Sequence, residues 1–290
     1  MKDLNQQLNE IKKSGCSISE KKSMLIKIGM RPRDIEWLEF SGFFNDDKPL
    51  TFGVEIECYN VRYHDIAQNA NGQFSFLFEG YNHTDRRGVY KFTTDCSIQG
   101  NDPRECVSPI LDNNSDGFAS LENCCRILNS VGARVNKSCG LHVHVGVEGM
   151  SDKAYVNIFK NYQKLERLID SFMAPSRRGN TNQYARTIAN YDYSDCDTIG
   201  SVASKMAYNR YHKVNPCAYA AHHTIEFRQH QGTVEYEKIS KWVNFCCKLV
   251  NYSKENVLAY TPQTIWDVPF LNTEEKEYYA GRISHFANEA

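Results

Sequence analysis

The chain has 290 residues and a mass of 33.3 kDa, with 34 Lys and Arg against 35 Asp and Glu. Its formal net charge of -1 excludes the strong positive charge that is typical of nucleic-acid-binding domains. Hydrophobic residues make up 41% and charged residues 24%, so the composition is that of a globular protein and not of a disordered one. This length suits one large domain with a small appendage.

Eleven cysteines are present, including the adjacent pairs Cys124-Cys125 and Cys246-Cys247, but there is no CxxC motif. An odd count without that spacing, together with a polar N-terminal stretch, favours reduced and buried thiols. No apolar run approaches the roughly 18 residues that cross a bilayer. The sequence therefore predicts a cytoplasmic protein with no membrane partner.

The first 48 residues are polar and helix-prone. Ser17 and Glu20 have the spacing of a capping box, Gly29 predicts a helix stop, and Pro32 suits the first turn of a second helix. Two helices around a glycine turn are also the outline of a helix-turn-helix. Residues 1–40 carry eight Lys and Arg against six Asp and Glu, a positive excess too small to favour DNA binding. We therefore predict a helical appendage over residues 1–48. The alternative is a non-catalytic adaptor that acts through this segment, with a nucleic acid or a protein as its partner.

Period-two alternation begins at Leu50, where one strand face is apolar and the other carries Glu55 and Glu57. Further strands are predicted over residues 89–94, 105–110, 133–136, 141–147, 207–214 and 223–229. Apolar stripes predict helices over 118–128, 155–172 (behind Ser151 as a cap) and 239–250, and residues 176–204 are predicted to form a long loop. Strands grouped with helices, without strict alternation, predict an α+β fold over residues 49–290 with a largely antiparallel sheet and packed helices.

Three of the predicted strands carry pairs of polar residues on one face. The pairs are Glu55 with Glu57, His142 with His144, and Glu226 with Arg228, which His230 follows on the same face. Adjacent carboxylates repel each other unless a cation lies between them, and two imidazoles on one face form half of a site for a divalent metal or a phosphate. Exposure or a surface ion pair explains each pair alone equally well. All three together favour a polar channel that binds Mg²⁺ or Mn²⁺ through oxygen ligands and a nucleotide phosphate through arginine.

No P-loop and no GxGxxG motif after a strand is present, so phosphate binding would not use those turns. HExxH and GxSxG are also absent, which removes the commonest zinc-protease and serine-hydrolase classes. The ordered set of polar motifs resembles the amidoligase family, the carboxylate-amine ligases related to glutamine synthetase and glutamate-cysteine ligase. The matching segments are 52–57 (FGVEIE), 95–97 (DCS), 105–109 (ECVSP), 138–144 (SCGLHVH), 210–215 (RYHKVN) and 224–233 (TIEFRQHQGT). Cys96 stands where a small residue, usually glycine, is expected.

The resemblance covers roughly residues 50–250 and implies an ATP-dependent ligase with a curved, glutamine synthetase-like antiparallel sheet. It implies that Mg²⁺ or Mn²⁺ is bound by Glu55, Glu57, Glu105, His142, His144 and Glu226, with His142 preferred over His144. Glu57 and Arg228 are then catalytic, and the phosphates of ATP are bound by Arg228, Arg210 and Lys205. Further candidates for substrate contacts are Asp95, Ser97, Arg186, Asn215 and His230, and beyond these Arg177, Arg178 and the segment 81–83.

A carboxylate is a poor electrophile, so the implied reaction first phosphorylates it with ATP, and an amine then displaces the phosphate to give an amide. The carboxylate and the amine belong to a small molecule, a peptide or a modified nucleotide. Two other reactions suit the same motifs. One is a metal-dependent amide hydrolase with a water on His142 and His144, and the other is a guanidino-type kinase.

Overall fold

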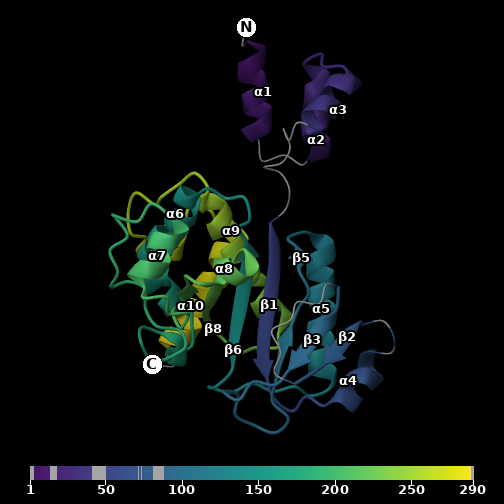
Figure 1. The fold of residues 1–290 in the computed structure, drawn as a ribbon, viewed down its shortest axis with the longest axis vertical. Helices are drawn as coiled ribbons and strands as arrows, with labels where there is room; N and C mark the ends of the chain where they lie inside the picture. Colours follow the sequence, from purple (N-terminus) through teal and green to yellow (C-terminus); the bar gives the residue numbers. More distant parts are fainter. Residues whose placement is uncertain are drawn as a thin grey trace. The chain divides into compact units, whose positions relative to one another are not determined.

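The computed structural model describes residues 3–13, 18–40, 50–70, 72, 74–80 and 88–288. The chain divides into two units, residues 1–49 and residues 50–290 (Figure 1). No helix in the described part of the chain is both long enough and apolar enough to cross a membrane.

The smaller unit contains three helices, α1 (Leu4–Lys13), α2 (Ile18–Lys27) and α3 (Pro32–Phe40). As predicted, Pro32 begins a helix, and Gly29 adopts a φ of 91°, a left-handed conformation that ends the preceding one. A small apolar cluster holds the helices together through Ile11, Leu25 and Ile35. Ser17, the predicted cap, lies outside the described residues.

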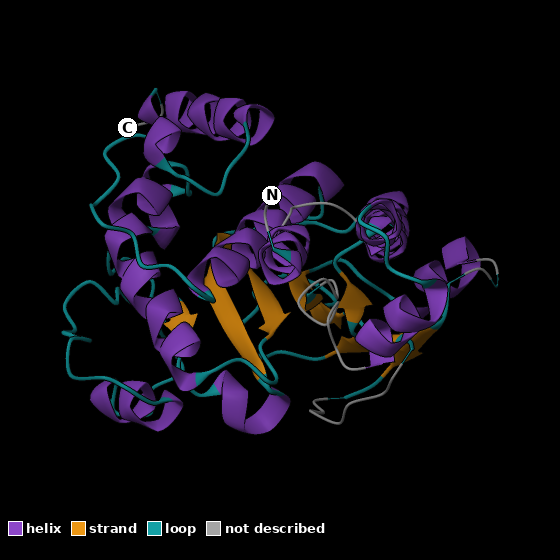
Figure 2. Ribbon diagram, turned by 90° about the horizontal axis from the view of Figure 1, so that it is seen from above, coloured by secondary structure: helices purple, strands orange, loops and turns teal. Residues whose placement is uncertain are grey.

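The larger unit is built on one eight-stranded sheet in the order β2-β3-β4-β1-β6-β8-β7, with β5 paired to β1. The strands are β1 (Thr51–Cys58), β2 (Phe76–Phe78), β3 (Tyr90–Thr93), β4 (Arg104–Val107), β5 (Leu111–Asp112), β6 (Gly140–Gly146), β7 (Val214–Asn215) and β8 (Thr224–Gln231). Among the described strands, β2 and β3 pair in parallel and the other pairs are antiparallel. Figure 2 shows neighbouring strands turned relative to one another in an open, twisted sheet. The prediction of a largely antiparallel sheet with packed helices is confirmed.

Helices α5 (Ser115–Ser130), α6 (Asp152–Ser171) and α9 (Tyr236–Ser253) contain the predicted helical ranges apart from the last residue, Phe172. The Ser151 hydroxyl accepts the Ala154 amide hydrogen, as expected of an N-cap. The other helical elements are α4 (Tyr63–Ala70), η2 (Pro175–Arg177), α7 (Ile199–Lys205), α8 (Ala218–His222), η3 (Ile265–Asp267) and α10 (Thr273–Ala287).

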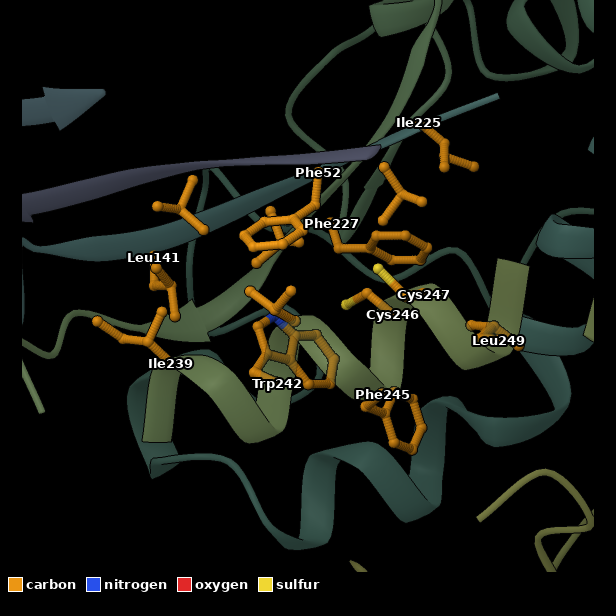
Figure 3. Packing of buried hydrophobic residues seen from close by; sticks show 14 of the residues in the cluster. Phe52, Leu141, Ile225, Phe227, Ile239, Trp242, Phe245, Cys246, Cys247 and Leu249 are labelled. Carbon is orange, nitrogen blue, oxygen red and sulfur yellow. The ribbon is translucent and has the colours of Figure 1, made fainter. Parts of the chain in front are cut away.

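The core lies between one face of the sheet and the helices α5, α6 and α9. Figure 3 shows Phe52, Leu141 and Phe227 of the strands above Trp242 and Cys246 of α9, all of them buried. Because successive side chains of a strand alternate between its two faces, the intervening residues of β1 and β6 point away from this core. The cysteines of the described segments are free, and most are buried, as predicted.

Three predicted strands and one predicted loop are wrong in part. The strand predicted over 105–110 ends at Val107. Residues 133–136 make only an isolated bridge between Arg134 and Tyr59, and of residues 207–214 only Val214 lies in a strand. Ala207 and Tyr208 both have a φ of 52°, which is incompatible with an extended chain. The predicted loop contains η2 and α7, and a capping box of Thr198 with Ser201 begins α7.

The prediction that His230 shares a face with Glu226 and Arg228 is also wrong. Leu141 of β6 pairs with His230, whereas Val143 pairs with Phe227, so β8 contains one residue more than β6 over this interval. Such a β-bulge interrupts the alternation of side chains. His230 is consequently buried against Trp242, with 5.8 Å between the ring centroids.

This burial predicts an acid-sensitive fold. Burial, assisted by the charge of Arg282, lowers the pKa of His230 from 6.5 to about 3. The unfolded chain takes up this proton below about pH 6.5 and the folded chain does not, so the folded state loses stability as the pH falls from about 6.5 towards 3. We expect His230→Leu to flatten the acid dependence of the free energy of unfolding, measured with urea. His64→Leu, at an exposed position of α4, should leave the slope unchanged; equal slopes in wild type and His230→Leu would contradict the prediction.

Candidate active site

Polar side chains form a continuous row across the sheet on the face opposite the core. The register pairs Thr93 with Glu105, Glu105 with Glu57, Glu55 with His142, His144 with Glu226, and Glu226 with Asn215. Directly opposed side chains of antiparallel strands lie about 5 Å apart, close enough to interact. The sheet therefore brings together the three polar strands that the sequence analysis singled out, and adds β3, β4 and β7 at their sides.

His142 lies in the middle of the row and is 3% exposed. Its Nδ1 is 2.9 Å from Glu55 Oε2 and 3.7 Å from Glu226 Oε1, and its Nε2 is 3.5 Å from Glu57 Oε1. One imidazole thus contacts three of the predicted carboxylates.

His144 occupies the next position on the same face of β6. Its Nδ1 is hydrogen-bonded to Thr224 Oγ1 at 2.9 Å. Its Nε2 is 3.4 Å from Glu55 Oε1, yet this buried nitrogen makes no hydrogen bond within the described residues. A buried ring nitrogen without a partner is an available ligand atom.

Three sets of side chains among the described residues have ligand atoms within 4.8 Å of one another. The sets are Glu55, Glu105 and His142; Glu55, His144 and Glu226; and Glu57, Asp95 and Glu105. Glu55 and Glu105 each belong to two sets. Two of the sets combine two carboxylates with one imidazole and the third consists of three carboxylates, and such donors suit Mg²⁺ or Mn²⁺.

Asp95 was expected to contact substrate, and its position suggests a different role. The carboxylate lies with those of Glu57 and Glu105, and its Oδ1 accepts the Ser97 amide hydrogen at 2.7 Å, which fixes its orientation. The sequence offered no signal for this, because Asp95 follows β3 and meets β1 and β4 only through strand pairing.

At the end of the row formed by β3, β4 and β1, the negative charges of neighbouring carboxylates repel one another. Burial raises the pKa of Glu105 well above its usual value, and the negative charges of Glu55, Glu57 and Asp95 raise it further. Burial alone would raise the pKa of Glu55, but the hydrogen bond with His142 and the nearby imidazole of His144 outweigh burial and lower it. A divalent cation would relieve the repulsion that acts on Glu105.

Arg228 lies at the other end of the row. Its Nη1 donates to Glu226 Oε1, and its Nε donates to the Tyr184 carbonyl at 3.2 Å. Asn215 Nδ2 donates to the second oxygen of Glu226 at 2.5 Å. Burial alone would raise the pKa of Glu226, but the charge of Arg228 lowers it, so this carboxylate stays ionised.

Arg210 and Arg228 both lie against the aromatic ring of Tyr211. The Tyr211 ring centroid is 5.1 Å from the Arg210 guanidinium carbon and 5.9 Å from that of Arg228. Tyr184 packs against the same ring, with 5.4 Å between centroids. The described structure therefore places two of the predicted phosphate-binding residues against one tyrosine ring.

Other candidate residues do not join the row. Lys205 forms an exposed ion pair with Asp195 at 2.6 Å. Arg186 is exposed, and its backbone pairs with that of Tyr211. The Ser97 backbone amide donates a hydrogen bond to the Asp95 carboxylate. His230 lies on the core face of the sheet. The segment 81–83 lies outside the described residues.

Gly140 separates the row from a further arginine, Arg177. The Gly140 amide hydrogen is donated to Glu57 Oε2 at 2.5 Å. A Cβ at this position would lie 3.0 Å from His142 Nε2 and 3.2 Å from Arg177 Nη2, so no larger residue fits without displacing them. The neighbouring thiol of Cys139 is buried, and burial raises its pKa, which disfavours a role as a nucleophile.

The carboxylate and imidazole cluster could hold a metal ion, and the arginines Arg177 and Arg228 are buried beside it. A family model described as "Putative amidoligase enzyme" matches residues 48–250. Because this match covers most of the sequence, the chain belongs to the amidoligase family. Membership supports a carboxylate-amine ligase in general terms.

Among solved structures, a bifunctional glutathione synthetase from Pasteurella multocida is similar, with 12% sequence identity and a TM-score of 0.40. The alignment covers 87% of this chain and 42% of that chain, so this chain spans less than half of its length. No curated protein matches the chain. None of these findings favours a nucleic-acid partner.

Proposed function

We propose that the protein is an ATP-dependent carboxylate-amine ligase that uses Mg²⁺ or Mn²⁺ and forms an amide through an acyl phosphate. The observation that carries the proposal is the row of carboxylates and imidazoles that ends at the buried Arg228, in a chain of the amidoligase family. We further propose that the sheet is of the glutamine synthetase-like kind.

The residues of the row fit divalent cations. Glu105 lies among like charges, and His144 Nε2 is buried without a hydrogen bond, and both arrangements are unfavourable until a cation is present. The ligands would be Glu55, Glu57, Asp95, Glu105, His142, His144 and Glu226. When bound, the ions neutralise the phosphates of ATP and orient them.

Arg228 would bind the phosphoryl group that is transferred. Its contacts with Glu226 and the Tyr184 carbonyl fix the plane of the guanidinium. Burial alone would lower its pKa, but the charges of Glu226 and Glu55 outweigh burial and raise the pKa. A guanidinium held in one plane presents two parallel donors to phosphate oxygens.

The proposed reaction has two steps. A carboxylate oxygen of the first substrate bonds to the γ-phosphorus as the bond from that phosphorus to the β,γ-bridging oxygen breaks, and ADP leaves. The neutral amine then attacks the acyl carbon, the carbon-oxygen bond to phosphate breaks, and the amine nitrogen loses a proton. The products are an amide, ADP and inorganic phosphate.

The test supplies Mg·ATP, hydroxylamine as the amine, and amino acids, dicarboxylic acids or peptides as the carboxylate. We expect release of ADP and phosphate together with a hydroxamate, and transfer of one ¹⁸O atom from a labelled carboxylate to phosphate. A phosphorylated product without an amide would instead indicate a guanidino-type kinase, and amide hydrolysis without nucleotide would indicate a hydrolase.

A further inference from the structure

Arg177 is a buried cation that the proposed mechanism does not use. The residue is 3% exposed, and its side chain forms no ion pair with a carboxylate of the described segments. Nη2 donates to the Cys139 carbonyl at 2.5 Å, whereas the buried Nε has no hydrogen-bond partner in the described structure. A buried charge without a counterion is costly unless a ligand compensates it.

The guanidinium of Arg177 lies against the carboxylate and imidazole row. A Cβ at Gly140 would lie 3.0 Å from His142 Nε2 and 3.2 and 3.3 Å from the two terminal nitrogens of Arg177. The amide of Gly140 is bonded to Glu57. Arg177 is thus beside the predicted metal ligands. The negative charge of Glu57 and the positive charge of Arg228 both act on its guanidinium.

The β8 bulge holds Arg177 in place. Gln229, next to Arg228 in the bulge, donates from Nε2 to the Arg177 carbonyl at 3.2 Å and to Asp170 Oδ1. Its Oε1 accepts the Tyr162 hydroxyl hydrogen. With both ends of the amide used, Gln229 ties the backbone of η2 to the strand that carries Arg228.

We propose that Arg177 and Arg228 together bind the terminal phosphoryl group of ATP, with Arg177 as a second catalytic arginine. The inference rests on the proposed ligase function. Two guanidinium groups that repel each other in the free protein would both be neutralised by one phosphoryl group. As the new oxygen-phosphorus bond forms and the bond to ADP breaks, negative charge spreads over the equatorial phosphoryl oxygens, which both cations stabilise.

The experiment measures the binding of Mg·ADP and of the non-hydrolysable Mg·AMP-PNP by isothermal titration calorimetry. We expect Arg177→Met to weaken AMP-PNP binding by about 10- to 100-fold, the range of a lost hydrogen bond between charged groups, and to change ADP binding less than about twofold. Arg126→Met is the matched control. Arg126 is exposed on α5 and donates to Asn123 Oδ1 at 2.7 Å, so both affinities should stay as in wild type.

The outcomes separate this inference from the function on which it rests. A folded Arg177→Met protein that binds both nucleotides with wild-type affinity overturns the inference. An equal loss of affinity for both nucleotides also overturns it, because that result would indicate a structural role. If circular dichroism shows that Arg177→Met is not folded, Arg177→Lys takes its place. A selective loss for AMP-PNP in that variant supports the inference and wild-type affinities overturn it. Failure of the wild type to bind either nucleotide overturns the proposed function and the inference with it.

Discussion

Glu57→Gln is expected to slow ligation strongly while the fold is retained. Glu57 is 6% exposed and lies opposite Glu105 in the neighbouring strand. Its Oε1 is 3.5 Å from His142 Nε2, and its Oε2 accepts the Gly140 amide hydrogen. Glutamine keeps a carbonyl oxygen for Gly140 but removes the negative charge that a divalent cation requires.

The expected loss is about 10²- to 10³-fold in kcat, comparable to the removal of one electrostatic contact to a transition state. The affinity for Mn²⁺, measured by electron paramagnetic resonance, should fall in parallel because the same carboxylate is proposed to bind the ion. Glu122→Gln, at an exposed position of α5, is the control and should match wild type in both measurements. Wild-type kcat in Glu57→Gln would remove this residue from the active site.

Lys213→Met is expected to have the largest effect on stability. Lys213 is fully buried, and its Nζ is 2.8 Å from Glu166 Oε1 and 2.5 Å from Asp170 Oδ1. Methionine preserves much of the side-chain volume but leaves both carboxylates without their cation. Breaking a buried ion pair from one side typically costs about 3 to 5 kcal/mol of unfolding free energy, a large part of the roughly 5 to 15 kcal/mol that stabilises a domain.

Lys205→Met is the matched control, because Lys205 and Asp195 form an ion pair of similar length at the surface. An exposed pair contributes about 1 kcal/mol or less, so urea unfolding should distinguish the two variants clearly. The double variant Lys213→Met with Asp170→Asn should recover part of the loss, since it removes one of the unpaired charges. Equal stability of the two single variants would show that the buried network contributes no more than the surface pair.

The Lys213 network also links stability to the candidate active site. The Lys213 carbonyl accepts the Arg228 amide hydrogen, and Glu166 accepts hydrogen bonds from Thr187 and Ile188. Asp170 accepts the Gly179 amide hydrogen. The segment that follows Arg177 is thereby tied to α6 and β8, so we expect nucleotide affinity to fall when this network is disrupted.

Much of the carboxylate and imidazole row could be predicted from local patterns. Alternation along β1 places Glu55 and Glu57 on one face, and alternation along β6 does the same for His142 and His144. These patterns depend on only a few consecutive residues, because the direction of a strand side chain follows from its position in the pleat. The order of the motifs also indicated the amidoligase family, which the match over residues 48–250 confirms.

Tertiary structure decided what depends on partners far away in the chain. The bulge in β8 exists only relative to β6, so local alternation could not show that His230 turns to Trp242 while Gln229 reaches Arg177. Arg177 and Arg178 are adjacent and chemically identical in the sequence, and packing alone directs the first to Gly140. The residues that carry charge and metal-binding capacity were therefore readable from the sequence. Their grouping followed from strand register and burial, which long-range contacts determine.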